Sequence, residues 1–126
     1  MRGLLEVQSR VIHEDKRGLF VEMFKGIEME NPVLGQVSIM RANAGEVRGG
    51  HFHKRKTEWF ALVDGKGKLV VEDVETGERE SLDMGKYEVV KIRAGLLHYV
   101  EAETDLIMLI YCDEPFFEED SDTYRK

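Results

Sequence analysis

The sequence predicts an all-β fold, either a sandwich or a barrel of short strands. Segments of apolar or alternating residues recur at short, even intervals along the chain. Turn-forming glycine, aspartate and proline residues separate these segments, and no long stretch has a convincing helical period. This combination is typical of both architectures, and periodicity alone favours neither.

The first part of the chain contains the least regular elements. Residues 4–12 alternate as one strand or a pair would, and residues 19–24 follow the turn-like sequence at 15–18. Residues 26–30 could form a single helical turn. Asn31 and Pro32 then interrupt the chain before the next expected strand.

Each later strand adjoins a turn signal, of which Asp64 with Gly65 is the strongest. These strands are expected at residues 36–40, 58–63, 68–74, 87–92, 98–102 and 106–111. The last of them is a nearly continuous apolar run, which favours a strand that is buried on both faces.

Length and composition narrow the class of protein. The 126 residues suit one domain spanning 1–126, and the net charge of -7 argues against nucleic acid as the main partner. The one basic run, Lys54 to Lys56, is either a solvated turn or a local attraction for a phosphorylated molecule. Cys112 is the only cysteine, and no signal peptide or membrane-length apolar run is present, so a cytoplasmic protein is expected.

Three histidines and a glutamate form the pattern that carries chemistry. His51 and His53 are two residues apart on an expected strand, so their side chains project from the same face. Glu58 shares a face with apolar residues of the next strand, where a carboxylate is costly unless a charge compensates it. His98 can join them from a later hairpin. His13 has no such neighbours and is expected at the surface.

This set suits a divalent transition metal. Three imidazoles and one carboxylate favour Zn, with Fe, Mn, Ni or Cu as alternatives, over Mg or Ca, which prefer oxygen ligands. The same residues could instead build a polar pocket without a metal.

Two segments of the chain, one carrying His51, His53 and Glu58 and the other carrying His98, resemble the two cupin motifs. The first, G(X)5HXH(X)3-4E(X)6G, is matched at Gly45, His51, His53, Glu58 and Gly65. The second, G(X)5PXG(X)2H(X)3N, is matched at Gly85, Gly95 and His98. It departs from the pattern because the run after Gly85 is longer, Arg93 replaces the proline and the final asparagine is absent. The resemblance implies a single cupin domain, a double-stranded β-helix or jelly-roll barrel.

A narrower resemblance extends over nearly the whole chain. Residues 15–24 are similar to the D-x-R-G-x-F-x-E-x-F stretch of sugar-nucleotide cupins such as dTDP-4-dehydrorhamnose 3,5-epimerases, and residues 47–51 resemble their V-R-G-x-H segment. The chain most resembles the C-terminal cupin domain of capsular polysaccharide UDP-sugar epimerase/reductases. That likeness is carried by residues 35–38, 48–53, 56–58, 113–116 and 121–124.

The resemblance implies a homodimeric epimerase or isomerase. Its substrate would be a nucleotide-linked 4-keto-6-deoxy sugar, modified next to the keto group during cell-surface polysaccharide biosynthesis. The chain would be the cupin without the reductase domain, which leaves open a separate reductase as a partner.

Epimerisation beside a ketone requires a general base and a group that stabilises the enolate, a role that suits a metal. His51 aligns with the catalytic base of the metal-free 3,5-epimerases and also with the first metal ligand of other cupins. One nitrogen cannot serve both purposes. If His51 binds metal, the candidate bases are Tyr99, Tyr111 and Lys56.

Arginines and one amide are the candidates for binding substrate. Arg17 and Arg48 could hold the diphosphate through bidentate contacts, and Gln36 could contact the sugar or nucleotide.

Functions from other classes also fit the sequence. They are a non-catalytic sugar- or metal-binding module, a metal-free 3,4-ketoisomerase of dTDP-sugars, and an iron-dependent dioxygenase.

Overall fold

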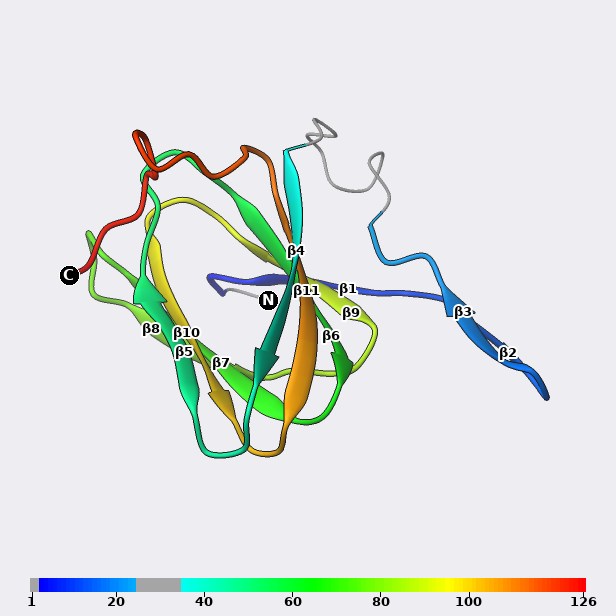
Figure 1. The fold of residues 1–126 in the computed structure, drawn as a ribbon. Helices are drawn as coiled ribbons and strands as arrows, with labels where there is room; N and C mark the ends of the chain where they lie inside the picture. The colour runs from blue at the N-terminus through cyan, green and yellow to red at the C-terminus, as the bar shows by residue number, and fades with distance from the viewer. Residues whose placement is uncertain (1–2, 25–34) are drawn as a thin grey trace.

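The computed structural model describes residues 3–24 and 35–126, and Figure 1 shows how their strands are arranged. In chain order these are β1 (Glu6–Ser9), β2 (Ile12–Asp15), β3 (Gly18–Val21), β4 (Gln36–Ala42), β5 (Val47–His51), β6 (Glu58–Asp64), β7 (Gly67–Asp73), β8 (Arg79–Asp83), β9 (Glu88–Ile92), β10 (Leu96–Ala102) and β11 (Leu106–Cys112). The predicted all-β class is confirmed. Within the described residues, no helix is long and apolar enough to cross a bilayer.

Strands β4 to β11 pair in a nested order. β4 pairs with β11, β5 with β10, β6 with β9 and β7 with β8, and each pair is antiparallel. Further pairing gives a five-stranded sheet, β1-β9-β6-β11-β4, and a four-stranded sheet, β5-β10-β7-β8. Nested pairing of this kind is the topology of a jelly roll. The strand pairing therefore confirms the jelly-roll barrel that the resemblance to cupins implies.

The two sheets enclose an apolar core. Side chains alternate across each strand, and on β10 the residues Leu96, His98 and Val100 are all buried. Leu69 and Met108, from opposite sheets, are fully shielded from solvent. Burying one such side chain contributes about 1.5–3 kcal/mol relative to leaving it exposed. His98 therefore lies on an inward face that is otherwise apolar.

A smaller apolar cluster covers part of the outer face of the five-stranded sheet. Its buried members are Trp59, Ala61, Val89 and Tyr111, with Met23, Phe24 and Leu109 packed against them. The expectation of two-sided burial for residues 106–111 is therefore met in part. Tyr111 is buried on this outer side, whereas Leu109 is only half-buried.

The hairpin of β2 and β3 extends away from the barrel (Figure 1). Its turn lies at the predicted position, because the register pairs Asp15 with Gly18. His13 is exposed on this hairpin, as predicted, and so are apolar residues such as Phe20. The helical turn predicted at residues 26–30 lies outside the described residues.

The edge strand β8 was not expected from the sequence. It alternates charged and polar residues around the half-buried Leu82, so it carries little apolar signal. It is the last strand of the four-stranded sheet, and within residues 3–24 and 35–126 it pairs with β7 alone. Polar residues on an edge strand discourage pairing with other chains, which explains why the hydrophobic pattern is weak there.

Candidate metal centre and pocket

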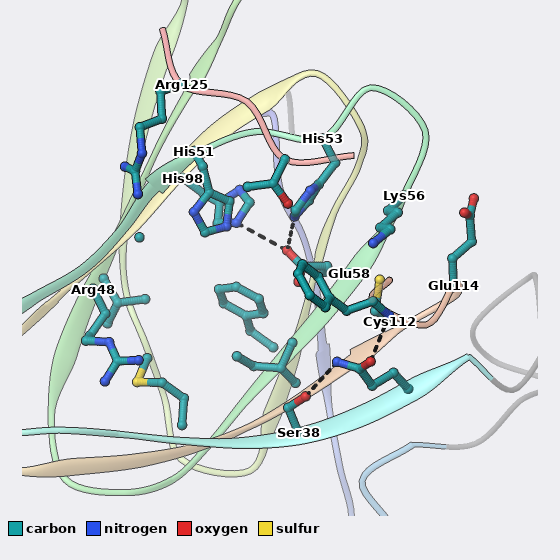
Figure 2. Close-up of a pocket in the computed structure, with 18 residues that line it drawn as sticks. Ser38, Arg48, His51, His53, Lys56, Glu58, His98, Cys112, Glu114 and Arg125 are labelled. Atoms are coloured by element: carbon teal, nitrogen blue, oxygen red, sulfur yellow. Dashed lines mark hydrogen bonds and ion pairs between the residues drawn. The ribbon is translucent and has the colours of Figure 1, made fainter. Parts of the chain in front are cut away.

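A cavity of about 450 Å³ lies between the two sheets, and Figure 2 shows the side chains that line it. Both sheets and the C-terminal tail contribute to its walls. Its apolar lining includes Met40, Phe60, Val100 and Ile110. The cavity is large enough for part of a small-molecule ligand.

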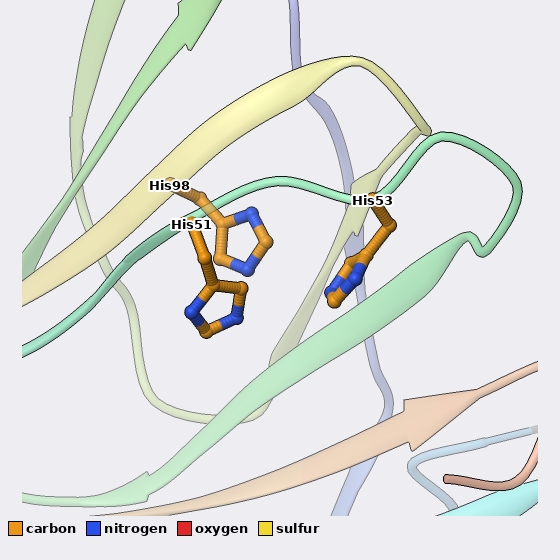
Figure 3. A group of neighbouring side chains, drawn as sticks. All are labelled: His51, His53 and His98. Atoms are coloured by element: carbon orange, nitrogen blue, oxygen red, sulfur yellow. The ribbon is translucent and has the colours of Figure 1, made fainter. Parts of the chain in front are cut away.

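The structure brings His51, His53 and His98 together (Figure 3). His51 ends β5 and lies directly opposite His98 of β10 in the strand register. The ring centroids of these two are 4.8 Å apart, and His53, in the turn after β5, lies 5.2 Å from His51. The predicted convergence of all three imidazoles on one point is confirmed by their positions.

Glu58 completes the cluster from the start of β6. Its Oε1 atom lies 3.1 Å from Nε2 of His53 and 3.2 Å from Nε2 of His98. Only 13% of the Glu58 side chain is exposed. The predicted carboxylate on an otherwise apolar inner face is therefore present, and its nearest neighbours are two imidazoles.

Backbone carbonyls fix the orientation of both imidazoles. Nδ1 of His53 lies 2.7 Å from the carbonyl oxygen of Asp122, and Nδ1 of His98 lies 3.0 Å from that of Leu96. A carbonyl can only accept a hydrogen bond, so each Nδ1 is the donor and carries a proton. In the neutral rings, the lone pairs on both Nε2 atoms are thereby directed at Oε1 of Glu58.

Two lone pairs that face a carboxylate oxygen repel it unless a cation lies between them. In the protein without metal, a proton on Nε2 of His53 takes that place. Burial lowers the pKa of His53, but the hydrogen bond and charge of Glu58 outweigh burial and raise it. Burial alone would raise the pKa of Glu58, yet hydrogen bonds from His53 and His98 hold it well below its usual value.

The pKa of His51 is shifted in the opposite direction from that of His53. Burial first, and then the charges of His98 and His53, lower the pKa of His51 to about 4. His51 is therefore neutral near pH 7 and has a lone pair available for a proton or a metal. The cluster thus contains one histidine that readily loses its proton and another that retains it.

The donor set fits a transition metal. Metal–ligand bonds of about 2.0–2.2 Å place adjacent ligand atoms about 2.8–3.5 Å apart, and both Nε2–Oε1 separations fall in that range. The histidine nitrogens lie within 4.8 Å of one another, so the half-buried His51 would turn inward to complete the set. Burial raises the pKa of the nearby Cys112 thiol to about 11, which leaves it protonated and a poor ligand at neutral pH.

Three other predicted residues line the same pocket. Lys56 is buried, and its Nζ donates to the carbonyl oxygen of Ser121 at 3.0 Å. Arg48 lies across the cavity from Lys56 (Figure 2). Gln36 uses its amide to join β4 to the tail, because its Oε1 accepts from the backbone amide of Phe116 at 2.8 Å.

Three predicted site residues are not brought into the pocket within one chain. Tyr99 follows His98 on β10 and so points to the other face, where its hydroxyl accepts a hydrogen bond from Arg79. Tyr111 follows the pocket residue Ile110 for the same reason and packs in the outer cluster. Arg17 lies in the β2–β3 turn, paired with Asp15 at 2.6 Å.

Sequence reasoning missed several pocket residues of the C-terminal tail. Arg125 lines the cavity, and its charge is one of the contributions that lower the pKa of His51. Glu114 lines the cavity across from Arg125 (Figure 2) and pairs with Arg55 at 2.9 Å. No motif spacing signals these residues. The only indication was that the tail took part in the resemblance.

A protein-family model described as the polysaccharide biosynthesis C-terminal domain matches residues 13–124. The chain belongs to this family. The matched region contains His51, His53, Glu58 and His98, so the whole candidate centre lies within the family's domain. The resemblance inferred from the cupin motifs is thereby confirmed.

Two longer proteins each contain a region that is similar to this chain. A Pseudomonas aeruginosa protein named UDP-2-acetamido-2,6-beta-L-arabino-hexul-4-ose reductase is 32% identical over 117 residues, which are 90% of this chain and 30% of that protein. The capsular polysaccharide assembling protein CapF from Staphylococcus aureus is also 32% identical, with a TM-score of 0.70 over 92% of this chain and 32% of its own. The chain thus spans about a third of the length of each.

A solved structure with lower sequence identity shares the fold. ChmJ, a 3'-monoepimerase from Streptomyces bikiniensis in complex with dTDP-quinovose, superposes with a TM-score of 0.85 at 24% identity. The match covers 97% of this chain and 69% of that one. At this identity the likeness establishes the shared jelly-roll fold.

Proposed function

We propose that the chain is a metal-dependent epimerase or isomerase of a nucleotide-linked 4-keto-6-deoxy sugar in cell-surface polysaccharide biosynthesis. The observation that carries the proposal is the convergence of the His53 and His98 Nε2 atoms on Oε1 of Glu58. Both nitrogens face inward because carbonyls hold the Nδ1 protons. The names of the relatives, a 4-ketose reductase, a capsule assembling protein and a sugar epimerase, support the substrate class.

The cofactor in this proposal is one divalent transition metal, with Zn first and Fe, Mn, Ni or Cu as alternatives. His51, His53, Glu58 and His98 would hold it. When bound, the metal supplies a Lewis acid for the oxygen of an enolate. The chain's own residues orient the sugar, exclude water and move the proton at the carbon next to the ketone.

Lys56 is the proposed base when His51 is a metal ligand. It is the only one of the three alternative bases that lines the pocket, and its Nζ is held by the Ser121 carbonyl. In a metal-free mechanism His51 would take the proton instead. The lowered pKa keeps this imidazole neutral at pH 7, so that its lone pair can accept a proton, but it also makes His51 a weaker base than an ordinary histidine.

Two guanidinium groups form the proposed binding site for the diphosphate. Arg48 and Arg125 both line the cavity, and neither pairs with a carboxylate among the described residues. Their hydrogen bonds run to the carbonyl oxygens of Arg41 and Gly50, which leaves the charges uncompensated. In a chain with a net charge of -7, two unpaired arginines facing one cavity favour an anionic ligand.

Metal analysis and solvent exchange together test this function. The purified protein is expected to contain about one transition metal per chain, and His98→Ala to lose it while remaining folded. In heavy water, the protein should introduce deuterium next to the keto group of a UDP- or dTDP-4-keto-6-deoxy sugar. Mass spectrometry of the recovered sugar detects the exchange.

The outcomes separate the alternatives. Exchange that persists after metal removal and is lost in His51→Ala would favour the metal-free isomerase. Tight nucleotide-sugar binding without exchange across a panel of such sugars would favour a non-catalytic module. Oxygen uptake by an iron-loaded sample would favour a dioxygenase.

A further inference from the structure

The C-terminal residues 121–125, here called the strap, run alongside the segment that carries His51 and His53. Tyr124 and Phe52 exchange two backbone hydrogen bonds of 2.9 Å, and their rings lie 5.6 Å apart. Arg125 donates to the carbonyl of Gly50. The strap therefore borders the ligand segment from one end to the other.

Asp122 makes the most contacts between the strap and this segment. Its carboxylate accepts hydrogen bonds from the backbone amides of Lys54, Arg55 and Lys56, each 3.0 Å long. Its own carbonyl accepts the Nδ1–H of His53 at 2.7 Å. One residue thus fixes both the turn after His53 and the orientation of the His53 ring.

The backbone of Asp122 is shaped for this arrangement. Its φ angle is 49°, in the left-handed region that few residues other than glycine, asparagine and aspartate adopt readily. The residue is only 4% exposed. A buried carboxylate persists only when hydrogen bonds from its surroundings satisfy it, as the three amides of the turn do here.

We propose that Asp122 is a positioning residue that holds His53 in the geometry needed for the metal centre. Its carboxylate sets where the turn at 54–56 lies, and its carbonyl sets which nitrogen of His53 faces Glu58. The proposal depends on the proposed metal centre for its functional meaning. The positioning of the ring can be tested without any metal.

The first test uses the wild-type protein without metal at pH 8. Hydrogen exchange should show the amides of Lys54, Arg55 and Lys56 to be strongly protected, although they lie in a turn. Nitrogen-15 spectra of the His53 ring should show that Nδ1 always carries a proton, whether or not Nε2 is also protonated. Exchange at the rate of an open turn, or a population of His53 rings with no proton on Nδ1, would overturn the proposal even if no variant folds.

The second test compares Asp122→Asn with two controls by titration with Co²⁺, followed by visible absorption. Asp122→Asn keeps the backbone carbonyl and tolerates the positive φ, but it turns an amide group toward three N–H donors. We expect Co²⁺ affinity to fall about 10–100-fold, as when a residue that supports a metal ligand is lost. Asp120→Asn, which removes an exposed carboxylate paired with Arg55, should retain wild-type affinity.

A control for stability separates positioning from general loosening. Leu82→Ala removes a half-buried side chain on β8, which lies at the opposite edge of the four-stranded sheet from β5. It should lower the unfolding temperature while leaving Co²⁺ affinity unchanged, since distant sites act independently. Wild-type affinity in Asp122→Asn would refute the proposal. If the wild type itself binds no Co²⁺, the metal centre is wrong, and the tautomer and exchange data still decide the role of Asp122.

Discussion

Individual residues in the cluster have their roles set by hydrogen bonds behind them. The Leu96 and Asp122 carbonyls hold the protons of His98 and His53 on Nδ1, and so direct both Nε2 atoms at Glu58. Without those carbonyls, either imidazole could present a proton to the cavity instead of a lone pair. Ligand capacity at this site is therefore a property of the tautomer as much as of the residue type.

The raised pKa of His53 predicts how metal affinity depends on pH. A raised pKa means that the folded protein holds this proton more tightly, so its contribution to stability is present below about pH 6.5 and is lost as pH rises through the folded pKa. A metal must displace the same proton. We expect Zn²⁺ to bind more weakly at pH 6 than at pH 8, with proton release at pH 6, as measured by calorimetry in buffers of different ionisation enthalpy.

The variant Glu58→Gln tests the cause of that dependence. Without the carboxylate, the pKa of His53 is no longer raised, so the fall in Zn²⁺ affinity should move to lower pH. The affinity at pH 8 should drop by more than about 100-fold, beyond the range for losing a residue that only supports a ligand. Glu101→Gln, an exposed position on the same strand as His98, serves as the control. An unchanged pH profile in Glu58→Gln would contradict the assignment.

Binding of an anion should depend on the two unpaired arginines. We predict that Arg48→Gln and Arg125→Gln each weaken binding of UDP about tenfold, because a hydrogen bond to a charged group contributes about 1.5–3 kcal/mol. Arg79→Gln removes the same charge from the outer surface near Tyr99 and should have little effect. Calorimetric titration measures all three. Equal weakening by all three variants would indicate only a general charge effect.

At the scale of the elements, an irregularity between β5 and β10 lies beside the histidines. The register shifts between His98 and Tyr99, and Gly49 lies at the shift with a φ of 112°. A Cβ at Gly49 would lie 2.7 Å from the carbonyl oxygen of His98. Close approach of the two backbones is thus part of what brings His51 opposite His98.

Gly49→Ala is therefore expected to affect both stability and the site. A positive φ costs a side-chain-bearing residue about 1–2 kcal/mol, and overpacking adds about 1–3 kcal/mol. Gly45→Ala isolates the first cost, because its φ is 85° but a Cβ there meets nothing within 4 Å. Urea unfolding should show the larger loss in Gly49→Ala, and only that variant should also lose metal affinity. Equal losses would mean that the close approach is unimportant.

For the molecule as a whole, the distribution of exposed apolar residues supports the predicted homodimer. Ile39 on the edge strand β4 is 73% exposed, and Phe20 on the projecting hairpin is 61% exposed. Apolar side chains on an edge strand, and on a hairpin that pairs with no further strand among the described residues, are typical of surfaces that pair with another chain. The homodimer itself is a prediction, and measurements of mass in solution test it.

Light scattering after size exclusion should give twice the chain mass. Ile39→Lys and Phe20→Glu are each expected to shift the protein toward the monomer while the barrel stays folded, because both side chains lie outside the core. Val47→Glu alters an apolar residue of similar exposure on β5 and is the control. A monomeric wild type, or loss of the dimer in Val47→Glu as well, would contradict this choice of interface.

Local pattern was enough to predict the class of the fold and the four central residues. Alternating segments between glycine turns require strands, and an acid beside inward apolar residues requires a compensating group. For that reason His51, His53, Glu58 and His98 could be selected from the sequence. The charged edge strand β8 escaped notice because it presents no apolar face to detect.

Only the tertiary structure decided what depends on contacts between distant segments. Nested pairing of β4 with β11 and of β5 with β10 produces the jelly roll, which the resemblance to cupins implied but which strand periodicity alone could not distinguish from other all-β architectures. The face to which each side chain points excluded Tyr99 and Tyr111 from the pocket, and the return of the tail brought Arg125 and Asp122 to it. Strand register and long-range hydrogen bonds set these positions, and neither leaves a periodic trace in the sequence.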